Sequence, residues 1–155
     1  MGSDPESVMR EWFDQVWNNG DAAAIDRLFH PDGVFRGLPT PDGQPIRGPI
    51  EFKPFHQAFV SALPDMRITL LHTVCQGDLV LAHCRVTGTH RGDGLGVPAT
   101  ERHLDFYGFA LGRVEGGQLR EGWNCFDFLD MYRQLGVELA FPAGSPPVGV
   151  SAPHE

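Results

Sequence analysis

The stretch from Arg113 to Gly136, which reads RVEGGQLREGWNCFDFLDMYRQLG, constrains the fold of this chain more than any other part. Two adjacent glycines, Gly116-Gly117, separate two runs of strand-forming residues, which predicts a hairpin with a second strand from Gln118 to Phe126. A short helix follows and ends at Gly136, since glycine readily takes the left-handed conformation that closes a helix. The stretch therefore places an amide, Asn124, and a carboxylate, Asp127, at the mouth of whatever the sheet encloses.

The first part of the chain has a helical pattern. Ser3-Asp4-Pro5 combines a capping side chain with a proline at the first helical position. Asp21 is expected to cap a second, shorter helix, and a third helix begins near Ile50. The apolar residues of the first helix form one continuous stripe: Val8, Met9, Trp12, Phe13, Val16 and Trp17. Those of the third also share one side: Phe52, Phe55, Phe59, Val60 and Leu63, together with His56.

After Pro64 the hydrophobic period changes from 3.6 to 2, which predicts strands over 66–76, 79–89 and 102–114. A short strand over 34–36 precedes a loop rich in turn residues, which is typical of a rim or lid over a site. Helices followed by antiparallel strands predict an α+β fold in which a curved, mostly antiparallel sheet wraps over the N-terminal helices. We expect one domain over 1–137 and a Pro/Gly-rich tail over 138–155.

Charge and composition exclude several classes of protein. The formal net charge of −8 arises from 20 acidic and 12 basic residues, and no stretch gathers the basic face that nucleic acid requires. The N-terminus lacks the pattern of a signal peptide and no segment is long enough to span a bilayer, so we expect a cytoplasmic protein that does not bind membranes. Cys75, Cys84 and Cys125 lie apart in apolar runs and are expected to be reduced core thiols.

The C-terminal half resembles the SnoaL-like polyketide cyclases and ester cyclases of the nuclear transport factor 2-like superfamily. The resemblance includes a Gly-x-Pro-x-Thr turn at 96–100, an Arg-bearing strand that enters a glycine turn at 113–117, and Asp127 followed by a helix that ends Gln134-Leu135-Gly136. Gly88-Thr89-His90 and the Asn-Gly-Asp ahead of His30-Pro31 extend it to roughly residues 12 to 136. The resemblance implies a cone-shaped α+β barrel and cofactor-free acid/base chemistry.

The family's aldol-type cyclases use an Asp on the last strand as general acid/base, helped by a His and a Gln on the neighbouring strand. An ungapped match places these groups at Asn124, Ala110 and Gly108, and a supporting Asn near Phe35. The chain departs from the pattern at all four positions. Because an amide cannot shuttle a proton as a carboxylate does, membership of the family does not carry its mechanism to this chain.

Strand parity extends the matched positions to a pocket, because residues two apart share a face of the sheet. The expected lining is small at the back and aromatic toward the front, which suits a flat, apolar or aromatic small ligand. It comprises Phe106, Gly108, Ala110, Gly122, Asn124 and Phe126, with Phe35 as a further candidate. Trp12, Phe13 and Phe59 belong to apolar stripes that form the core and could also roof the cavity.

Three residues are candidates for the chemistry. Asn124 could polarise a ligand carbonyl or enolate oxygen, or could be a buried amide satisfied by the backbone. Asp127 could be the missing base if it turns inward, or it could cap the helix that follows. His90 could be an acid/base group at the pocket mouth, or an exposed loop histidine.

The face opposite the expected lining carries His103, Asp105 and Tyr107, with Trp123 and Arg85 nearby. A His-Asp pair at i, i+2 is compatible with a catalytic dyad, whereas large apolar neighbours favour a homodimer through this outer face. If the parity were inverted by one residue, this set would line the pocket instead. The seven histidines show neither HxH nor HExxH spacing, so we expect no metal site.

Three functions remain open at this point. The first is a cofactor-free cyclase, isomerase or lyase acting on a cyclic carbonyl compound, with Asn124 as the carbonyl partner and Asp127 or His90 as the proton carrier. The second is a ligand-binding or accessory protein of the same fold that has lost the chemistry. The third is an epoxide hydrolase or a dehydratase, which requires the His103-Asp105 pair to point into the cavity.

Overall fold

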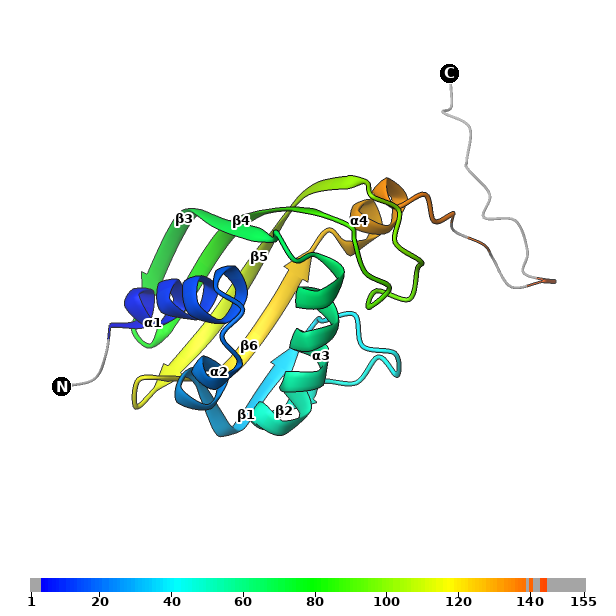
Figure 1. Cartoon of the computed structure of the whole chain (residues 1–155). Coiled ribbons are helices and arrows are strands. Elements are labelled where there is room, and N and C mark those ends of the chain that lie inside the picture. Colours follow the sequence, from blue (N-terminus) through cyan, green and yellow to red (C-terminus); the bar gives the residue numbers. More distant parts are fainter. Residues whose placement is uncertain (1–3, 139, 141–142, 145–155) are drawn as a thin grey trace, which may run out of the picture.

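The computed structural model describes residues 4–138, 140 and 143–144 and shows helices lying on one face of a single curved sheet (Figure 1). The predicted tail lies almost entirely outside the described residues. In chain order the elements are α1 Pro5–Glu11, the π-helix η1 Trp12–Asn18, α2 Ala22–Leu28, β1 Phe29–Arg36, β2 Ile46–Arg47, α3 Gly48–Ala62, β3 Arg67–Gln76, β4 Leu79–Thr89, β5 His103–Glu115, β6 Gln118–Phe126 and α4 Phe128–Gln134.

The six strands run in the order β2-β1-β6-β5-β4-β3. Every neighbouring pair is antiparallel except β1 and β6, which are parallel. The predicted α+β class, the mostly antiparallel sheet and the hairpin between β5 and β6 are therefore confirmed. Within the described residues no helix is long and apolar enough to cross a membrane.

The first helix begins as predicted but changes its pitch. The Asp4 carboxylate accepts a hydrogen bond of 3.1 Å from the backbone N–H of Ser7 and so caps α1, while Ser3 lies outside the described residues. From Trp12 onward the helix continues as η1, a π-helix, which the sequence pattern did not predict. A π-helix is wider than an α-helix and is often found at functional sites. It carries Trp12 and Phe13 into the core.

Two further elements differ from expectation. β1 is longer than the predicted strand over 34–36, because the chain becomes extended at Phe29 and passes through a register shift before Val34. α3 begins at Gly48, two residues earlier than expected, and Pro54 lies inside it. The carbonyl that Pro54 leaves without a donor belongs to Ile50, which is 86% exposed, so water can satisfy it.

The two faces of the sheet differ in burial along β5. Even-numbered residues from Leu104 to Val114 are buried, while odd-numbered residues are exposed or half-buried. Cys84, on the inner face of β4, is buried, and this burial raises the pKa of its thiol to about 12. The expectation of three core thiols was wrong for Cys75 and Cys125, which are exposed. Cys125 lies opposite Phe109 on the outer face, whereas Cys75 lies opposite Val80 on the inner face, next to the last residue of β3.

Aromatic side chains fill the space between the helices and β1. Trp12 of η1 meets Phe35 edge-on at 5.3 Å between ring centroids and Phe52 of α3 at 5.2 Å. Phe29 and Phe35 stack at 3.9 Å. Each fully buried aromatic side chain contributes on the order of 1.5–3 kcal/mol of transfer free energy, so this cluster is a main source of stability.

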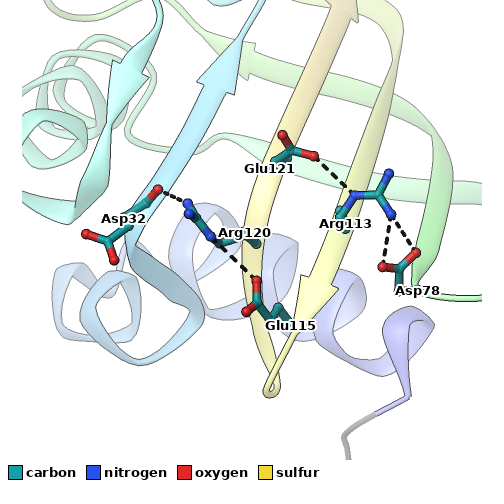
Figure 2. A network of polar contacts seen from close by, with 6 residues as sticks. All are labelled: Asp32, Asp78, Arg113, Glu115, Arg120 and Glu121. Carbon is teal, nitrogen blue, oxygen red and sulfur yellow. Dashed lines mark hydrogen bonds and ion pairs between the residues drawn. The ribbon is translucent and has the colours of Figure 1, made fainter.

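Two arginines near the β5–β6 turn tie β1, β5, β6 and the β3–β4 turn together (Figure 2). Arg113 Nη1 lies 2.8 Å from an Asp78 carboxylate oxygen in the β3–β4 turn, and its Nε lies 3.1 Å from Glu121 of β6. Arg120 donates to the backbone carbonyl of Asp32 in β1. Arg113, which precedes the glycine turn, thus has a structural role. Its ion pairs are partly exposed, so each contributes at most about 1 kcal/mol to stability.

Gly37 allows β1 to leave the sheet beside Asn124 of β6. Its φ of 79° is one that residues with a side chain rarely adopt. A Cβ atom at this position would overlap the backbone carbonyl of Asn124. Gly43, in the loop that follows, also has a positive φ of 67°, but a Cβ there would meet no atom within 4 Å. Substitutions at these two glycines therefore separate the energetic cost of the backbone conformation from that of the close approach to Asn124.

We predict that Gly37→Ala lowers the free energy of unfolding by about 2–5 kcal/mol, the sum of left-handed strain and overpacking. Gly43→Ala is expected to cost only about 1–2 kcal/mol, because the strain is present without the overlap. Urea denaturation of both variants checks this difference. Equal destabilisation would show that the contact between Gly37 and Asn124 is not tight.

Candidate functional site

An apolar cavity lies between the inner face of the sheet and helices η1, α3 and α4. Its volume is about 50 Å³. The residues lining it are Trp12, Phe13, Trp17, Phe35, Leu38, Phe52, Phe55, Phe59, Met66, Ile68, Val86, Phe106, Asn124, Phe126 and Phe128. Among these described lining residues there is no carboxylate, histidine, cysteine, tyrosine or basic side chain. Asn124 supplies the only side-chain carbonyl.

The predicted lining is largely found here. Trp12, Phe13, Phe35, Phe59, Phe106, Asn124 and Phe126 all line the cavity, so the even-numbered residues of β5 and β6 do face inward. Gly108, Ala110 and Gly122 share that inner face but do not line it. The reason is aromatic packing: a Cβ on Gly108 would overlap the ring of Phe126, and one on Gly122 would lie 2.7 Å from the ring of Phe35.

The orientation of Asn124 is fixed by the backbone. Its Nδ2 donates a hydrogen bond of 3.0 Å to the carbonyl of Arg36 at the end of β1. Because a carbonyl can only accept, the amide nitrogen must face Arg36. One N–H and the Oδ1 atom remain for a ligand. Asn124 is thus both satisfied by the backbone and able to donate to one ligand oxygen and accept from another group.

Asp127 lies outside the cavity lining and caps α4. Its Oδ1 accepts a hydrogen bond of 3.0 Å from the backbone N–H of Asp130, and the residue is exposed. The structure therefore does not bring Asp127 together with Asn124 in one cavity.

His90 is fully buried, so the alternative of an exposed loop histidine was wrong. The backbone N–H of Thr100 donates to its Nδ1 at 3.2 Å, and the Thr100 hydroxyl lies 3.0 Å from the same atom. Since a backbone N–H only donates, the ring proton resides on Nε2, which is buried without a hydrogen-bond partner. His90 anchors the loop after β4 and does not line the cavity.

The His103-Asp105 pair lies on the outer face of the sheet. Asp105 makes two hydrogen bonds to Arg85, at 2.9 and 2.6 Å, and this guanidinium lowers the pKa of the carboxyl group below its usual value. Tyr107 and Phe109, on the same face, are 47% and 46% exposed. A dyad inside the cavity is thereby excluded. Among the described residues no group of three His, Cys, Asp or Glu side chains could hold a metal ion.

A broad groove of about 980 Å³ adjoins the cavity. It lies between the loop after β1 and the loop after β4, and Phe55 and Phe59 of α3 line both spaces. Tyr132 of α4 donates from its hydroxyl to the carbonyl of Leu95 at 3.2 Å and so holds the second loop in place. Burial raises the pKa of Tyr132, which keeps the phenol neutral. The turn-rich loop after β1 thus forms one side of this groove.

Several lining residues were not identified as site residues from the sequence. Trp17, Phe52 and Phe55 belong to the apolar stripes of η1 and α3, and a sequence stripe does not show which of its members border a hollow. Phe128 follows the cap of α4 and reaches the cavity because the helix folds back over the sheet. Leu38 lies in the loop after β1, where the sequence offers no periodic signal.

Comparison with known proteins gives a consistent result. The model of the SnoaL-like polyketide cyclase family matches residues 7–135. Wild-type IdmH from Streptomyces antibioticus is similar at 30% identity and a TM-score of 0.73, over 86% of this chain and 99% of IdmH. TsrD from Streptomyces laurentii is similar at 27% identity and a TM-score of 0.73, over 84% and 93% of the two chains.

A SnoaL-like protein from Jannaschia sp. CCS1 has a TM-score of 0.77 over 87% of this chain and 93% of its own, but at 20% identity it shows the fold alone. No curated protein matches the chain. The family model covers most of the chain, and its residues include every element from η1 to α4. The chain belongs to the SnoaL-like polyketide cyclase family.

Proposed function

We propose that this protein is a cofactor-free enzyme that catalyses ring closure, isomerisation or elimination on a cyclic carbonyl compound whose carbonyl group reaches the apolar cavity. The observation that supports it is an aromatic cavity with one amide, Asn124, held by the backbone and facing the hollow. IdmH, which is similar over nearly its whole length, is described provisionally as a polyketide cyclase. That description applies to IdmH and gives the reaction class proposed here.

The proposed role of Asn124 is to donate its remaining N–H to the ligand oxygen on which negative charge develops. In an apolar cavity such a donor is worth more than in water, because the local dielectric is low. The cavity lining offers no titratable side chain among the described residues, so the proton moves within the substrate or through water from the groove. Asp127 and His90 were expected to carry the proton. Neither residue lines the cavity, which supports a lesser role for both in the chemistry.

A binding protein without catalysis is the alternative that one observation favours. The cavity is lined by aromatic and aliphatic side chains, and the groups of the family's acid/base site are replaced by Ala110, Gly108 and Asn124. Such a protein would hold a carbonyl ligand in the same place and release it unchanged. No comparable observation favours an epoxide hydrolase or a dehydratase, since the His103-Asp105 pair faces outward.

We also propose that the protein is a cytoplasmic homodimer formed through the outer face of β3, β4 and β5. Tyr107 and Phe109 are exposed there beside Leu71 and Val74, which are 40% and 64% exposed. Arg85 and Asp105, which lie on the same face, already pair with each other. A two-fold axis would lay this apolar patch on a copy of itself.

The carbonyl contact can be tested with acetylnaphthalene and isopropenylnaphthalene, which have nearly the same shape but differ in having an oxygen or a CH₂ group. We predict that the protein binds the ketone about five- to tenfold more tightly, the value of roughly 1 kcal/mol of net hydrogen bond. Quenching of Trp12 and Trp17 fluorescence, both in the lining, measures binding. Asn124→Leu should remove the difference, whereas Asn19→Leu, at an exposed helix end, should leave it unchanged.

Catalysis can be separated from binding by deuterium exchange. We predict that the protein accelerates exchange of the methyl protons of acetylnaphthalene in D₂O at least tenfold over buffer, because stabilising the enolate oxygen lowers the barrier to proton loss. Asn124→Leu should abolish this acceleration, while Asp127→Asn should retain most of it. Ketone that binds in an Asn124-dependent way but exchanges no faster than in buffer would support the binding protein.

The dimer is tested by the mass of the protein in solution. We predict that Phe109→Asp converts a dimer to a monomer in sedimentation equilibrium, because two-fold symmetry brings two buried carboxylates into one interface. Leu129→Asp is the matched control, since Leu129 of α4 is also 46% exposed but lies away from this face. A wild-type protein that sediments as a monomer at high micromolar concentration would contradict the proposal.

A further inference from the structure

The inner cavity is too small to hold a cyclic ligand by itself. Its volume of about 50 Å³ is below the roughly 300–1,000 Å³ of small-molecule sites. The adjoining groove, at about 980 Å³, is within that range, and the two spaces share Phe55 and Phe59. A cyclic ligand that touches Asn124 can extend past these rings into the groove, which is the larger of the spaces that border the cavity. The site has two compartments, an apolar cavity and a wider groove open to water.

The two compartments differ in charge. Asp42, Glu51 and Asp93 line the groove, and none of the described lining residues is a lysine or an arginine. Two of the carboxylates are held in place: Asp42 accepts from the backbone N–H of Gln44 at 3.0 Å, and Glu51 accepts from that of Arg47 at 2.7 Å. The net charge of −8 on the whole chain has the same sign. The groove is therefore a region of negative potential around the outer part of any ligand.

We infer that the substrate has a compact, flat carbonyl end that enters the cavity and an extension that carries hydroxyl or amine groups and no negative charge. This inference rests on the proposed function, since it concerns the substrate of the same site. A carboxylic acid, or an acyl group still attached to a phosphate-bearing carrier, would place an anion among three carboxylates. Like charges in the same groove disfavour binding, and salt screens the effect because the groove is open. Thr40, Gln44 and Tyr132 offer polar partners for a hydroxylated extension.

The inference is tested with three probes built on acetylnaphthalene, each with a short ether chain that ends in a hydroxyl, an ammonium or a carboxylate group. At low ionic strength we expect the ammonium probe to bind on the order of tenfold more tightly than the carboxylate probe, with the hydroxyl probe between them. In 0.5 M salt, where the Debye length is only a few ångströms, this difference should fall to about twofold or less.

Two triple variants distinguish local from overall charge. Asp42→Asn, Glu51→Gln and Asp93→Asn together remove the groove carboxylates but keep the side-chain acceptors, and should abolish the difference between the charged probes. Asp14→Asn, Asp26→Asn and Glu115→Gln remove the same formal charge away from the groove, and should leave most of the difference. Equal binding of the ammonium and carboxylate probes to the wild-type protein at low salt would overturn the inference, as would an unchanged difference in the groove variant.

The hydroxyl probe separates failure of this inference from failure of the proposed function. If it binds and Asn124→Leu weakens it, the carbonyl site stands even when the charged probes bind equally. If none of the three probes binds, the proposed function fails and the inference, which depends on it, fails as well.

Discussion

The parallel pairing of β1 with β6 is the constraint on which the site depends. It sets Phe35 beside Gly122 and Arg36 beside Trp123, so that the chain at Gly37 passes the backbone of Asn124. Three consequences follow from this one pairing: the Phe35 ring occupies the space above Gly122, the carbonyl of Arg36 orients the Asn124 amide, and the loop after β1 begins at the edge of the cavity. The polar group of the cavity is thus positioned by backbone geometry, which is stiffer than a network of side chains.

The cavity offers few groups that can take part in chemistry, because its walls are mostly aromatic. Phe52, Phe55 and Phe59 of α3 pack against the tryptophans of η1, with Trp17 in contact with each of the three at 5.8 to 6.4 Å between ring centroids. His56, between them, is buried and donates to the carbonyl of Val16 at 2.6 Å, and burial lowers the pKa of its imidazole. The histidine therefore satisfies a carbonyl of the π-helix as a neutral group and stays out of the chemistry. The groove, which shares Phe55 and Phe59 with the cavity, brings charged side chains close to a ligand there.

Much of this architecture could be predicted from local patterns. The alternation in β5 and β6 identified the inward face, and Gly116-Gly117 identified the hairpin, because both are set by neighbours in sequence. The parallel pairing of β1 with β6 joins residues nearly ninety apart and leaves no local trace, so the anchoring of Asn124 by Arg36 could not be foreseen. The burial of His90 was also missed, because its glycine-rich loop indicates exposure. In the structure this loop packs against α3, and the backbone N–H of Arg91, the residue after His90, donates to the carbonyl of Ala62.

Three of the four departures from the acid/base site that the family resemblance implies are physically coupled. Positions 108 and 126 face each other across β5 and β6, as do 110 and 124. The ring of Phe126 occupies the space that a side chain at 108 would need, so a Gln there and Phe126 in this position exclude one another. Without a Gln and a His as partners, a carboxylate at 124 would be charged among aromatic rings, and its pKa would rise at a cost in stability. An amide avoids that cost because it is uncharged, and the carbonyl of Arg36 accepts a hydrogen bond from it. Gly108, Ala110 and Asn124 are therefore consistent as a set. Where the resemblance implies a polar wall that transfers protons, this chain has a packed aromatic wall with one neutral amide.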